Sequence, residues 1–140
     1  MKLRDVMTRN PTAIEPSASI QDAARVMRDE DTGVVPIVEH GRPVGVVTDR
    51  DIVVRAIADG GQFDRRVRDI ASTDLVTVDA DLSTEDAARL MGERQVRRVL
   101  VCEKDRLVGI ASIGDLAVKE GHDRRMGDTL EDISQGVKRR

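Results

Sequence analysis

Two short segments carry the residues best suited to binding a polar ligand. Each has a glycine, two small or apolar residues, Ser or Thr, two variable residues and an aspartate: Gly45-Val46-Val47-Thr48-Asp49-Arg50-Asp51 and Gly109-Ile110-Ala111-Ser112-Ile113-Gly114-Asp115. A carboxylate accepts hydrogen bonds from hydroxyl groups, and the free N–H groups at a helix start bind phosphate. The two segments therefore combine groups that suit a ligand with hydroxyls and a phosphate.

The same residues also fit a purely structural role. Thr48 and Asp51, like Ser112 and Asp115, have the spacing of a helix N-cap with an acidic third position. Such a cap needs no ligand and stabilises a helix by about 1 kcal/mol. The ligand and capping interpretations both remain open from the sequence.

Catalytic and metal-binding chemistry has little support. His40 lies in a predicted turn, His122 near the end of the chain, and Cys102 in a predicted strand, without further ligands at metal spacing. A nucleotide hydrolase would need a carboxylate cluster for a metal or an activated nucleophile, and neither has a spaced signature. We therefore expect a protein that is not an enzyme and requires no metal or other cofactor.

The composition argues against nucleic-acid-binding, membrane-spanning and secreted proteins. The 140 residues include 23 basic and 26 acidic side chains, giving a net charge of -3, and Phe63 is the single aromatic residue. Neither a basic field nor base-stacking platforms for nucleic acid can be built. No apolar run approaches the roughly 18 residues of a membrane span, and the N-terminus lacks the apolar core of a signal peptide. We expect a cytoplasmic protein that binds neither membranes nor nucleic acid.

An internal repeat organises the chain. The segment Leu3-Arg4-Asp5-Val6 recurs as Val67-Arg68-Asp69-Ile70, at an offset of 64 residues. The same offset relates Ser19 to Ser83, Asp22-Ala23-Ala24-Arg25 to Asp86-Ala87-Ala88-Arg89, and Asp51 to Asp115. Two copies are too few for a solenoid, so we expect them to pack against each other with pseudo-two-fold symmetry.

Each copy predicts a strand, a helix, two strands and a second helix. In the first copy a helix is expected from Ser19 to Asp29, a hairpin over residues 34–38 and 44–47 that turns at His40-Gly41, and a second helix from Thr48 to about Gly60. The second copy repeats these elements, with strands at 99–102 and 107–111 and a helix from Ser112. The prediction is an α/β (α+β) fold.

The predicted boundaries follow from the repeat. The first motif covers residues 1–59, a linker 60–66, and the second motif 67–119. A tail at 120–140 lies outside the repeat, and its segment 129–133 could form a short helix. We assign that tail no function.

With these motifs in hand, the sequence resembles the CBS motif family over residues 1 to about 119. The segments at 45–51 and 109–115 carry the family's strongest feature. The resemblance implies tandem units that form a Bateman module. Stand-alone CBS pairs of prokaryotic type are the nearest match in organisation.

The resemblance also implies roles for individual residues. Asp51 and Asp115 would hold ribose hydroxyls, with Thr48 and Ser112 beside the phosphates. Arg50 is a further candidate, with ion pairing to its neighbouring aspartates as the alternative. The pocket of Asp115 would receive adenine against Thr8, Pro11, Thr12 and Ala13; that of Asp51 would use Ser72, Leu75, Val76 and Thr77.

Two further features bear on these pockets. Arg97 and Arg98 occupy positions that contact phosphates in energy-sensing relatives, whereas the first copy has Gly33-Val34, so the two sites are not equivalent. Gly45 and Gly109 lie inside predicted strands, which suits a close approach to the backbone, and a bound nucleoside is one candidate for it.

The expected function is a regulatory sensor that binds AMP, ADP or ATP between the motifs and acts on an unidentified partner protein. The repeated Ala23-Ala24 and Ala87-Ala88 pairs permit close helix approach, and the resemblance implies dimerisation through such helices, so a homodimer is expected. Two alternatives remain: an interaction or stress-associated module with non-functional pockets, and a nucleotide-hydrolysing enzyme.

Overall fold

The computed structural model describes residues 1–120, which form two compact units. We name each unit after its motif aspartate. The Asp115 unit comprises Met1–Asn10, Val76–Lys104 and the chain from Val108, and the Asp51 unit comprises Pro11–Leu75 and Asp105–Leu107. The units therefore do not coincide with the two halves of the sequence.

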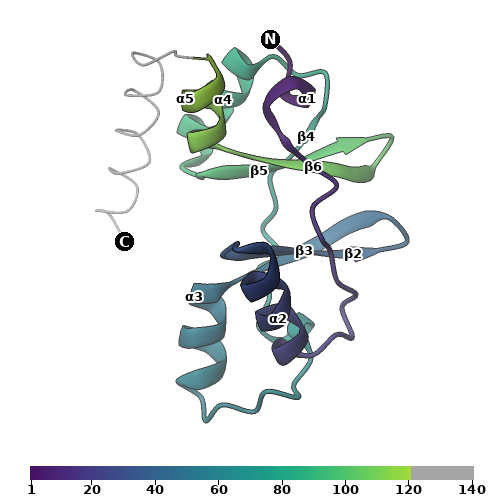
Figure 1. Ribbon diagram of the computed structural model, residues 1–140, viewed down its shortest axis with the longest axis vertical. Helices are drawn as coiled ribbons and strands as arrows, with labels where there is room; N and C mark the ends of the chain where they lie inside the picture. Colours follow the sequence, from purple (N-terminus) through teal and green to yellow (C-terminus); the bar gives the residue numbers. More distant parts are fainter. Residues whose placement is uncertain (121–140) are drawn as a thin grey trace. The chain divides into compact units, whose positions relative to one another are not determined.

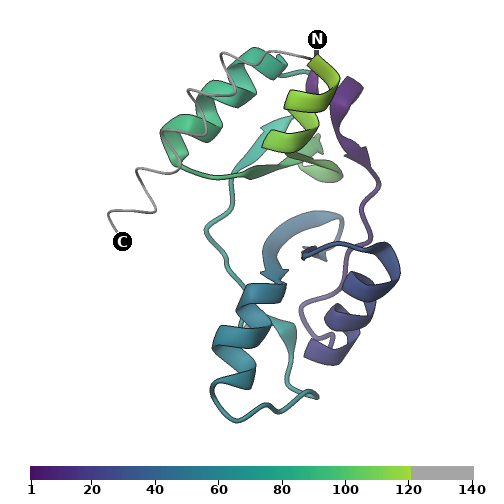
Figure 2. The ribbon, with the colours of Figure 1, turned by 60° about the vertical axis from the view of Figure 1, so that its left-hand side comes forward.

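The Asp115 unit is built on a four-stranded sheet with the strand order β1-β6-β5-β4. Its strands are β1 (Thr8–Arg9), β4 (Thr77–Asp79), β5 (Arg98–Glu103) and β6 (Arg106–Ser112). Strand β1 runs antiparallel to β6, whereas β4 runs parallel to β5. The helices α4 (Thr84–Arg94) and α5 (Ile113–Glu120) lie on one face of this sheet, and α1 (Leu3–Val6) contacts α5 (Figures 1 and 2).

The Asp51 unit is built on the hairpin of β2 (Val34–Glu39) and β3 (Arg42–Thr48). Its helices are α2 (Ile20–Glu30), the short α3 (Asp49–Asp51), which continues as the π-helical η1 (Ile52–Ile57), and the 3₁₀ turn η2 (Val67–Asp69). Single-residue bridges extend the hairpin on both edges, with Ile14 parallel to Ile37 and Ser72 antiparallel to Val46. Each unit has its own apolar core.

The two units follow one plan, at the offset of 64 residues. The pair Thr8–Ile110 in one unit corresponds to the bridge Ser72–Val46 in the other. In each case the start of one repeat pairs with the last strand of the other repeat. The repeats therefore exchange their first segments, and neither unit is complete within one half of the sequence.

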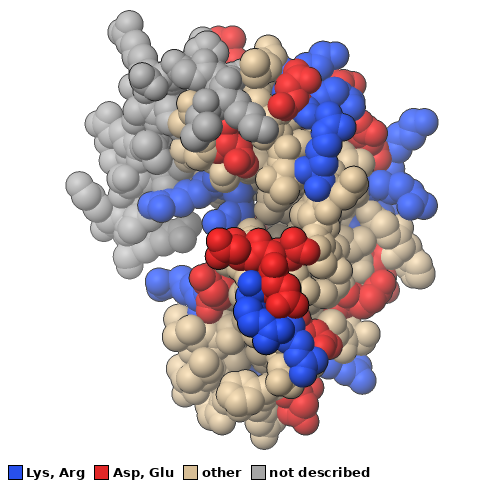
Figure 3. Space-filling model, in the orientation of Figure 1, with Lys and Arg blue, Asp and Glu red and all other residues tan. Residues whose placement is uncertain are grey.

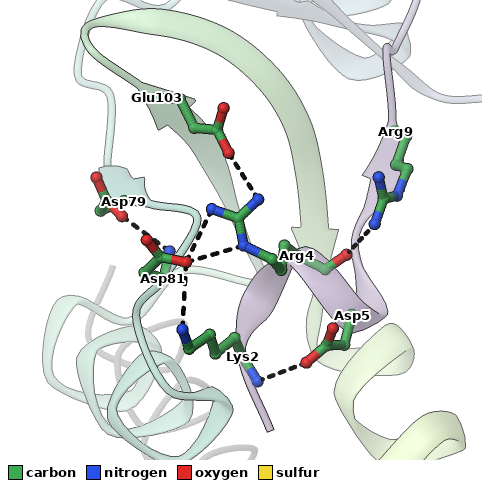
Figure 4. A network of polar contacts seen from close by, with 7 residues as sticks. All are labelled: Lys2, Arg4, Asp5, Arg9, Asp79, Asp81 and Glu103. Atoms are coloured by element: carbon green, nitrogen blue, oxygen red, sulfur yellow. Dashed lines mark hydrogen bonds and ion pairs between the residues drawn. The ribbon is translucent and has the colours of Figure 1, made fainter.

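The N-terminal segment is fixed to the Asp115 unit by a network of charges (Figure 4). The Arg4 guanidinium lies 2.8 Å from Asp81 Oδ1 and 2.7 Å from Glu103 Oε1. Lys2 Nζ lies 3.6 Å from the same Asp81 oxygen. The hydrogen bond from Arg4 holds the pKa of Asp81 below its ordinary range. In the other repeat Ser17 and Glu39 occupy the positions of Asp81 and Glu103, so this network belongs to one exchanged segment alone.

The local sequence signals explain where the elements begin and turn. Ser19 caps α2 through its Oγ, which accepts from the Asp22 N–H at 3.0 Å, while the Asp22 carboxylate accepts from the Ser19 N–H at 3.1 Å. The β2–β3 hairpin turns at His40 and Gly41, both with positive φ, as a two-residue turn of this kind requires. The predicted helix at 19–29 and the predicted hairpin are confirmed.

Other features were not anticipated. The short helices α1 and η2, at equivalent positions in the two repeats, carry too few residues to show a helical period. The second helix of the first repeat is mostly π-helical rather than a regular α-helix. The segment predicted as a short helix at 129–133 lies outside the described residues. Within residues 1–120 the helices are all too short or too polar to cross a bilayer.

Candidate ligand site at the aspartate motifs

Both motif aspartates close the same pair of hydrogen bonds with their Ser or Thr. Thr48 Oγ1 accepts from the Asp51 N–H at 3.0 Å, and Asp51 Oδ2 accepts from the Thr48 N–H at 2.9 Å. The corresponding distances for Ser112 and Asp115 are 3.1 and 2.9 Å. The capping interpretation is therefore confirmed in both repeats. Each cap uses only Oδ2 of its aspartate, so Oδ1 is not needed for capping and the ligand interpretation stays open.

Asp51 has an additional neighbour within its own helix. The Arg55 Nε lies 3.8 Å from Asp51 Oδ1, and the Asp51 side chain is only 14% exposed. Arg55 Nη1 also donates to the Ile70 carbonyl at 3.2 Å. Arg55 thus links the motif to the exchanged segment. The i,i+4 spacing of Arg55 from Asp51 is the sequence signal for this contact.

Arg50 does not behave as the pairing alternative suggested. Its backbone N–H donates to Asp49 Oδ1 at 2.8 Å, and its side chain is exposed. Within residues 1–120 no ion pair joins its guanidinium to Asp49 or Asp51. A ligand contact of the Arg50 side chain remains a prediction.

The two motif glycines have protein neighbours that explain them. A Cβ on Gly45 would lie 3.2 Å from the Ser72 carbonyl oxygen, and one on Gly109 would lie 3.0 Å from the Thr8 carbonyl oxygen. Ser72 and Thr8 belong to the exchanged segments. The close approach expected at these glycines is thus made by the chain itself, which removes the need for a nucleoside there.

The remaining candidates in the Asp51 unit occupy several positions. Ser72 exchanges two backbone hydrogen bonds with Val46, at 2.9 and 3.0 Å. Val46 lies two residues before Thr48 on the same strand. Thr12 lies between the half-buried Pro11 and the exposed Ala13, and its hydroxyl donates to Glu30 Oε1 at 2.9 Å. Leu75 is half-buried near the end of this unit's sequence. Of these, Ser72 has the clearest connection to the motif.

In the Asp115 unit, the candidates lie along the sheet. Thr8 is exposed and pairs with Ile110, two residues before Ser112. Val76 and Thr77 lie beside β5 instead: the Val76 carbonyl accepts from the Leu100 N–H at 3.0 Å, and Thr77 pairs with Leu100.

The arginine pair lies beside the start of α5. The Arg97 carbonyl accepts from the Ile113 N–H at 3.0 Å, which places Arg97 next to the residue that follows Ser112. Arg97 and Arg98 are both exposed. On the face drawn in Figure 3, basic and acidic side chains are interspersed, so any anion site there depends on local groups.

The predicted pockets are divided between the compact units. Thr8 shares a unit with Asp115, whereas Pro11, Thr12 and Ala13 belong to the Asp51 unit. Likewise Ser72 and Leu75 share a unit with Asp51, whereas Val76 and Thr77 belong to the Asp115 unit. The joint pockets remain predictions.

Comparison with known families agrees with the repeated motif and its capped aspartates. The family model described as CBS domain matches residues 3–57 and 67–119. The chain belongs to the CBS domain family. It is 38% identical over 132 residues to the CBS domain-containing protein YhcV of Bacillus subtilis (strain 168), covering 94% of each chain.

Solved structures of CBS proteins share this fold. Hypoxic Response Protein I, whose crystal structure holds two coordinated zinc ions, has a TM-score of 0.76 and 34% identity, over 85% of this chain and 98% of that one. The CBS domain pair of protein MJ0100, in complex with 5′-methylthioadenosine and S-adenosyl-L-methionine, has a TM-score of 0.75 and 26% identity, over 88% and 98%.

The zinc ions belong to the first neighbour's structure, and the described part of this chain shows no comparable cluster of metal ligands. Across residues 1–120 no three His, Cys, Asp or Glu side chains come together in a way that could hold a metal ion. Cys102 is half-buried in β5, and His40 lies in the turn of the other unit's hairpin. We derive no role through a metal.

Proposed function

We propose that this CBS pair is a regulatory module that binds an adenosine-containing ligand, with AMP, ADP or ATP as the expected ligands. The observation that carries the proposal is the duplicated capped aspartate. Asp51 and Asp115 are both half-buried at the start of a helix, with Oδ2 held by a backbone N–H at 2.9 Å. A carboxylate fixed in this way has a second oxygen positioned in advance for hydroxyl donors.

Ribose is the part of the ligand that such a carboxylate recognises. Its two vicinal hydroxyls are donors, and Thr48 or Ser112 lies one helical turn before the carboxylate, at the end of the helix where N–H groups favour a phosphate. The complex of the MJ0100 pair with two adenosine derivatives supports the same ligand class for this chain. Adenine would be read by backbone groups near Thr8 or Ser72.

Ligand binding could regulate a partner protein because the candidate residues of each predicted pocket belong to both units. A ligand that contacts members of both units favours those arrangements in which the contacts are made together. A partner protein that prefers one arrangement would then bind with an affinity coupled to that of the ligand. No catalytic step is needed for this function.

A ligand-free interaction module is the second candidate. It is favoured by the fact that both caps are complete within the protein, so neither motif needs a ligand to satisfy its hydrogen bonds. A hydrolase is the third, and it would convert the added nucleotide to products during incubation.

Thermal unfolding with AMP, ADP, ATP, 5′-methylthioadenosine and S-adenosylmethionine separates these candidates. A ligand at 100 times its dissociation constant adds about 2.7 kcal/mol to the stability of the folded state. We expect at least one of these ligands to raise the midpoint, and the double variant Asp51→Ala with Asp115→Ala to abolish the shift. Asp22→Ala is the matched control, because Asp22 closes the same kind of capping box outside the motifs. Absence of a shift with every ligand would leave the interaction module.

A further inference from the structure

The two motifs differ in charge at two equivalent pairs of positions. Residue 33 in the first repeat corresponds to residue 97 in the second, and residue 49 corresponds to residue 113. The backbone contact between them is the same, since Asp49 N–H donates to the Gly33 carbonyl at 3.0 Å and Ile113 N–H donates to the Arg97 carbonyl at 3.0 Å. The side chains are opposite in character: glycine and aspartate in one repeat, arginine and isoleucine in the other.

Asp49 places a carboxylate over the start of α3. Its Oδ2 lies 3.0 Å from the point where a Cβ on Gly33 would stand, so it occupies the space beside that glycine. Its Oδ1 accepts from the Arg50 N–H at 2.8 Å. The first N–H groups of this helix are thereby taken up by Gly33, Asp49 and Thr48, and a negative charge stands in front of them.

The start of α5 has the opposite arrangement. Ile113 is buried, and within the described residues no acceptor lies against the Gly114 N–H. Among the described residues, a Cβ on Gly114 would meet only Ser112 Oγ, at 3.5 Å. Arg97 and Arg98 are exposed beside it, and neither has a carboxylate partner among residues 1–120.

We propose that the two motifs select ligands of different charge. The Asp115 motif takes an adenosine ligand with a phosphate at its 5′ position, and the Asp51 motif takes an adenosine derivative whose 5′ group is neutral or cationic. This assignment rests on the proposed function and specifies the ligand class of each motif. Two arginines attract a phosphate, whereas the Asp49 carboxylate repels it.

The charged side chains of the Asp51 motif and the helix that follows it, residues 49–57, are Asp49, Arg50, Asp51 and Arg55. Arg55 is 53% exposed and pairs with Asp51, whereas the exposed Arg50 guanidinium has no ion pair among the described residues. Asp49 and Arg50 are thus the two charged side chains of the motif without an ion pair in the described part of the chain. Their charges offset each other, so this motif has no excess of positive charge, whereas the Asp115 motif has two arginines beside one aspartate.

Calorimetric titration of single-motif variants tests the assignment. Asp51→Ala leaves the Asp115 motif, and Asp115→Ala leaves the Asp51 motif. With AMP and 5′-methylthioadenosine as probes, we expect Asp51→Ala to bind AMP on the order of tenfold more tightly than 5′-methylthioadenosine, and Asp115→Ala to show the reverse order. If an alanine variant does not fold, the corresponding asparagine variant is used.

A charge-neutral replacement provides the matched control. Asp49→Asn in the Asp115→Ala background removes the charge but keeps an oxygen for the Arg50 N–H. It should raise AMP affinity on the order of tenfold and leave 5′-methylthioadenosine unchanged. Equal preference at both motifs, or AMP binding at the Asp51 motif that is lost in Arg50→Ala, would overturn the charge assignment and leave the proposed function standing. Failure of both probes to bind the wild-type protein would overturn the charge assignment, and the proposed function would fall with it only if ADP, ATP and S-adenosylmethionine also failed to bind.

Discussion

The side chain of Met7 packs directly against Gly109, in the middle of β6. A Cβ on this glycine would lie 2.9 Å from Met7 Cγ and 3.0 Å from the Thr8 carbonyl oxygen. Met7 and Thr8 come from the first repeat, whereas Gly109 belongs to the second. The glycine of the family motif is thus where an exchanged segment lies closest to the strand beside it.

Gly109→Ala should accordingly destabilise the fold. Forcing a methyl group into a packed site typically costs 1–3 kcal/mol, and here one of the obstructing atoms is backbone. Gly45→Ala should cost less, since its nearest neighbour would be at 3.2 Å. Urea unfolding measures both, with Gly114→Ala as the control, because that position is helical and open. Equal stability of wild type and Gly109→Ala would contradict the packing described for β1.

Alanine variants of two capping serines, one outside the motifs and one inside, separate the capping role from the ligand-binding role. Ser83→Ala and Ser112→Ala each remove a side chain that accepts the N–H of an aspartate three residues later, at 3.0 and 3.1 Å. Both variants should lose about 1 kcal/mol of stability. Only Ser112→Ala should also weaken AMP binding in the calorimeter. A similar loss of affinity in Ser83→Ala would indicate that the effect comes from stability alone.

The charge network on Arg4 predicts an acid-dependent contribution to stability. The hydrogen bond from Arg4 lowers the pKa of Asp81 below the ordinary value of 3.8. The folded state therefore favours the carboxylate, and its contribution is present above the ordinary value and is lost as the pH falls through the lowered pKa.

Asp81→Asn should be less stable than wild type at pH 7, and the difference should shrink as the pH falls below 4. Thermal unfolding across this range provides the measurement. Asp105→Asn is the control, because its partner Arg42 lies at 4.0 Å and both side chains are mostly exposed. A difference between wild type and Asp81→Asn that stays constant with pH would exclude this ion pair as the cause.

The homodimer remains a prediction. Of the alanine pairs that suggested it, Ala24 is exposed, whereas Ala23, Ala87 and Ala88 are buried within the cores of their own units. Larger apolar side chains also face outward on η1, where Val53, Val54 and Ile57 are 55%, 51% and 51% exposed. We expect Val54→Asp to convert a homodimer to a monomer in sedimentation experiments, with Val44→Asp as an exposed control in the same unit. A monomeric wild type would refute the dimer.

Most local elements could be predicted from the sequence because their signals are local. Ser19 and Asp22 mark a helix start, and His40-Gly41 separates two β-branched runs. The duplication then predicted the same elements 64 residues later. What could not be predicted is the partner of each repeat's first segment, because Thr8 and Ser72 carry no signal for the strand that they join. That pairing spans up to about one hundred residues and depends on tertiary packing.

In the candidate site, too, local contacts could be predicted from the sequence and long-range contacts could not. The capping geometry of Asp51 and Asp115 follows from four consecutive residues, so the sequence predicted it. The contacts of Asp49 with Gly33 and of Arg55 with Ile70 join residues 16 and 15 positions apart, and they required the structure. The charge differences between the repeats at Arg97, Arg98 and Asp49 were visible in the sequence, but the position of the Asp49 carboxylate beside Gly33 was not.

Exchange of the first segments also predicts how fragments behave. Residues 1–62 lack η2 and Ser72, and residues 63–140 lack α1 and β1, so each fragment would miss part of its core. We expect each fragment alone to be largely unfolded by circular dichroism, and an equimolar mixture to regain structure. Independent folding of either half would argue against the exchange.

The same exchange sets an order of events during synthesis. A ribosome has synthesised nearly all of the Asp51 unit once it has added residue 75, whereas the Asp115 unit needs both the first ten residues and the strand that ends at Ser112. At roughly 5–20 residues per second, the N-terminal segment waits several seconds for its partner strand to be made. During that interval its apolar residues Leu3, Val6 and Met7 are unprotected, and the nascent chain is most exposed to chaperones and to aggregation.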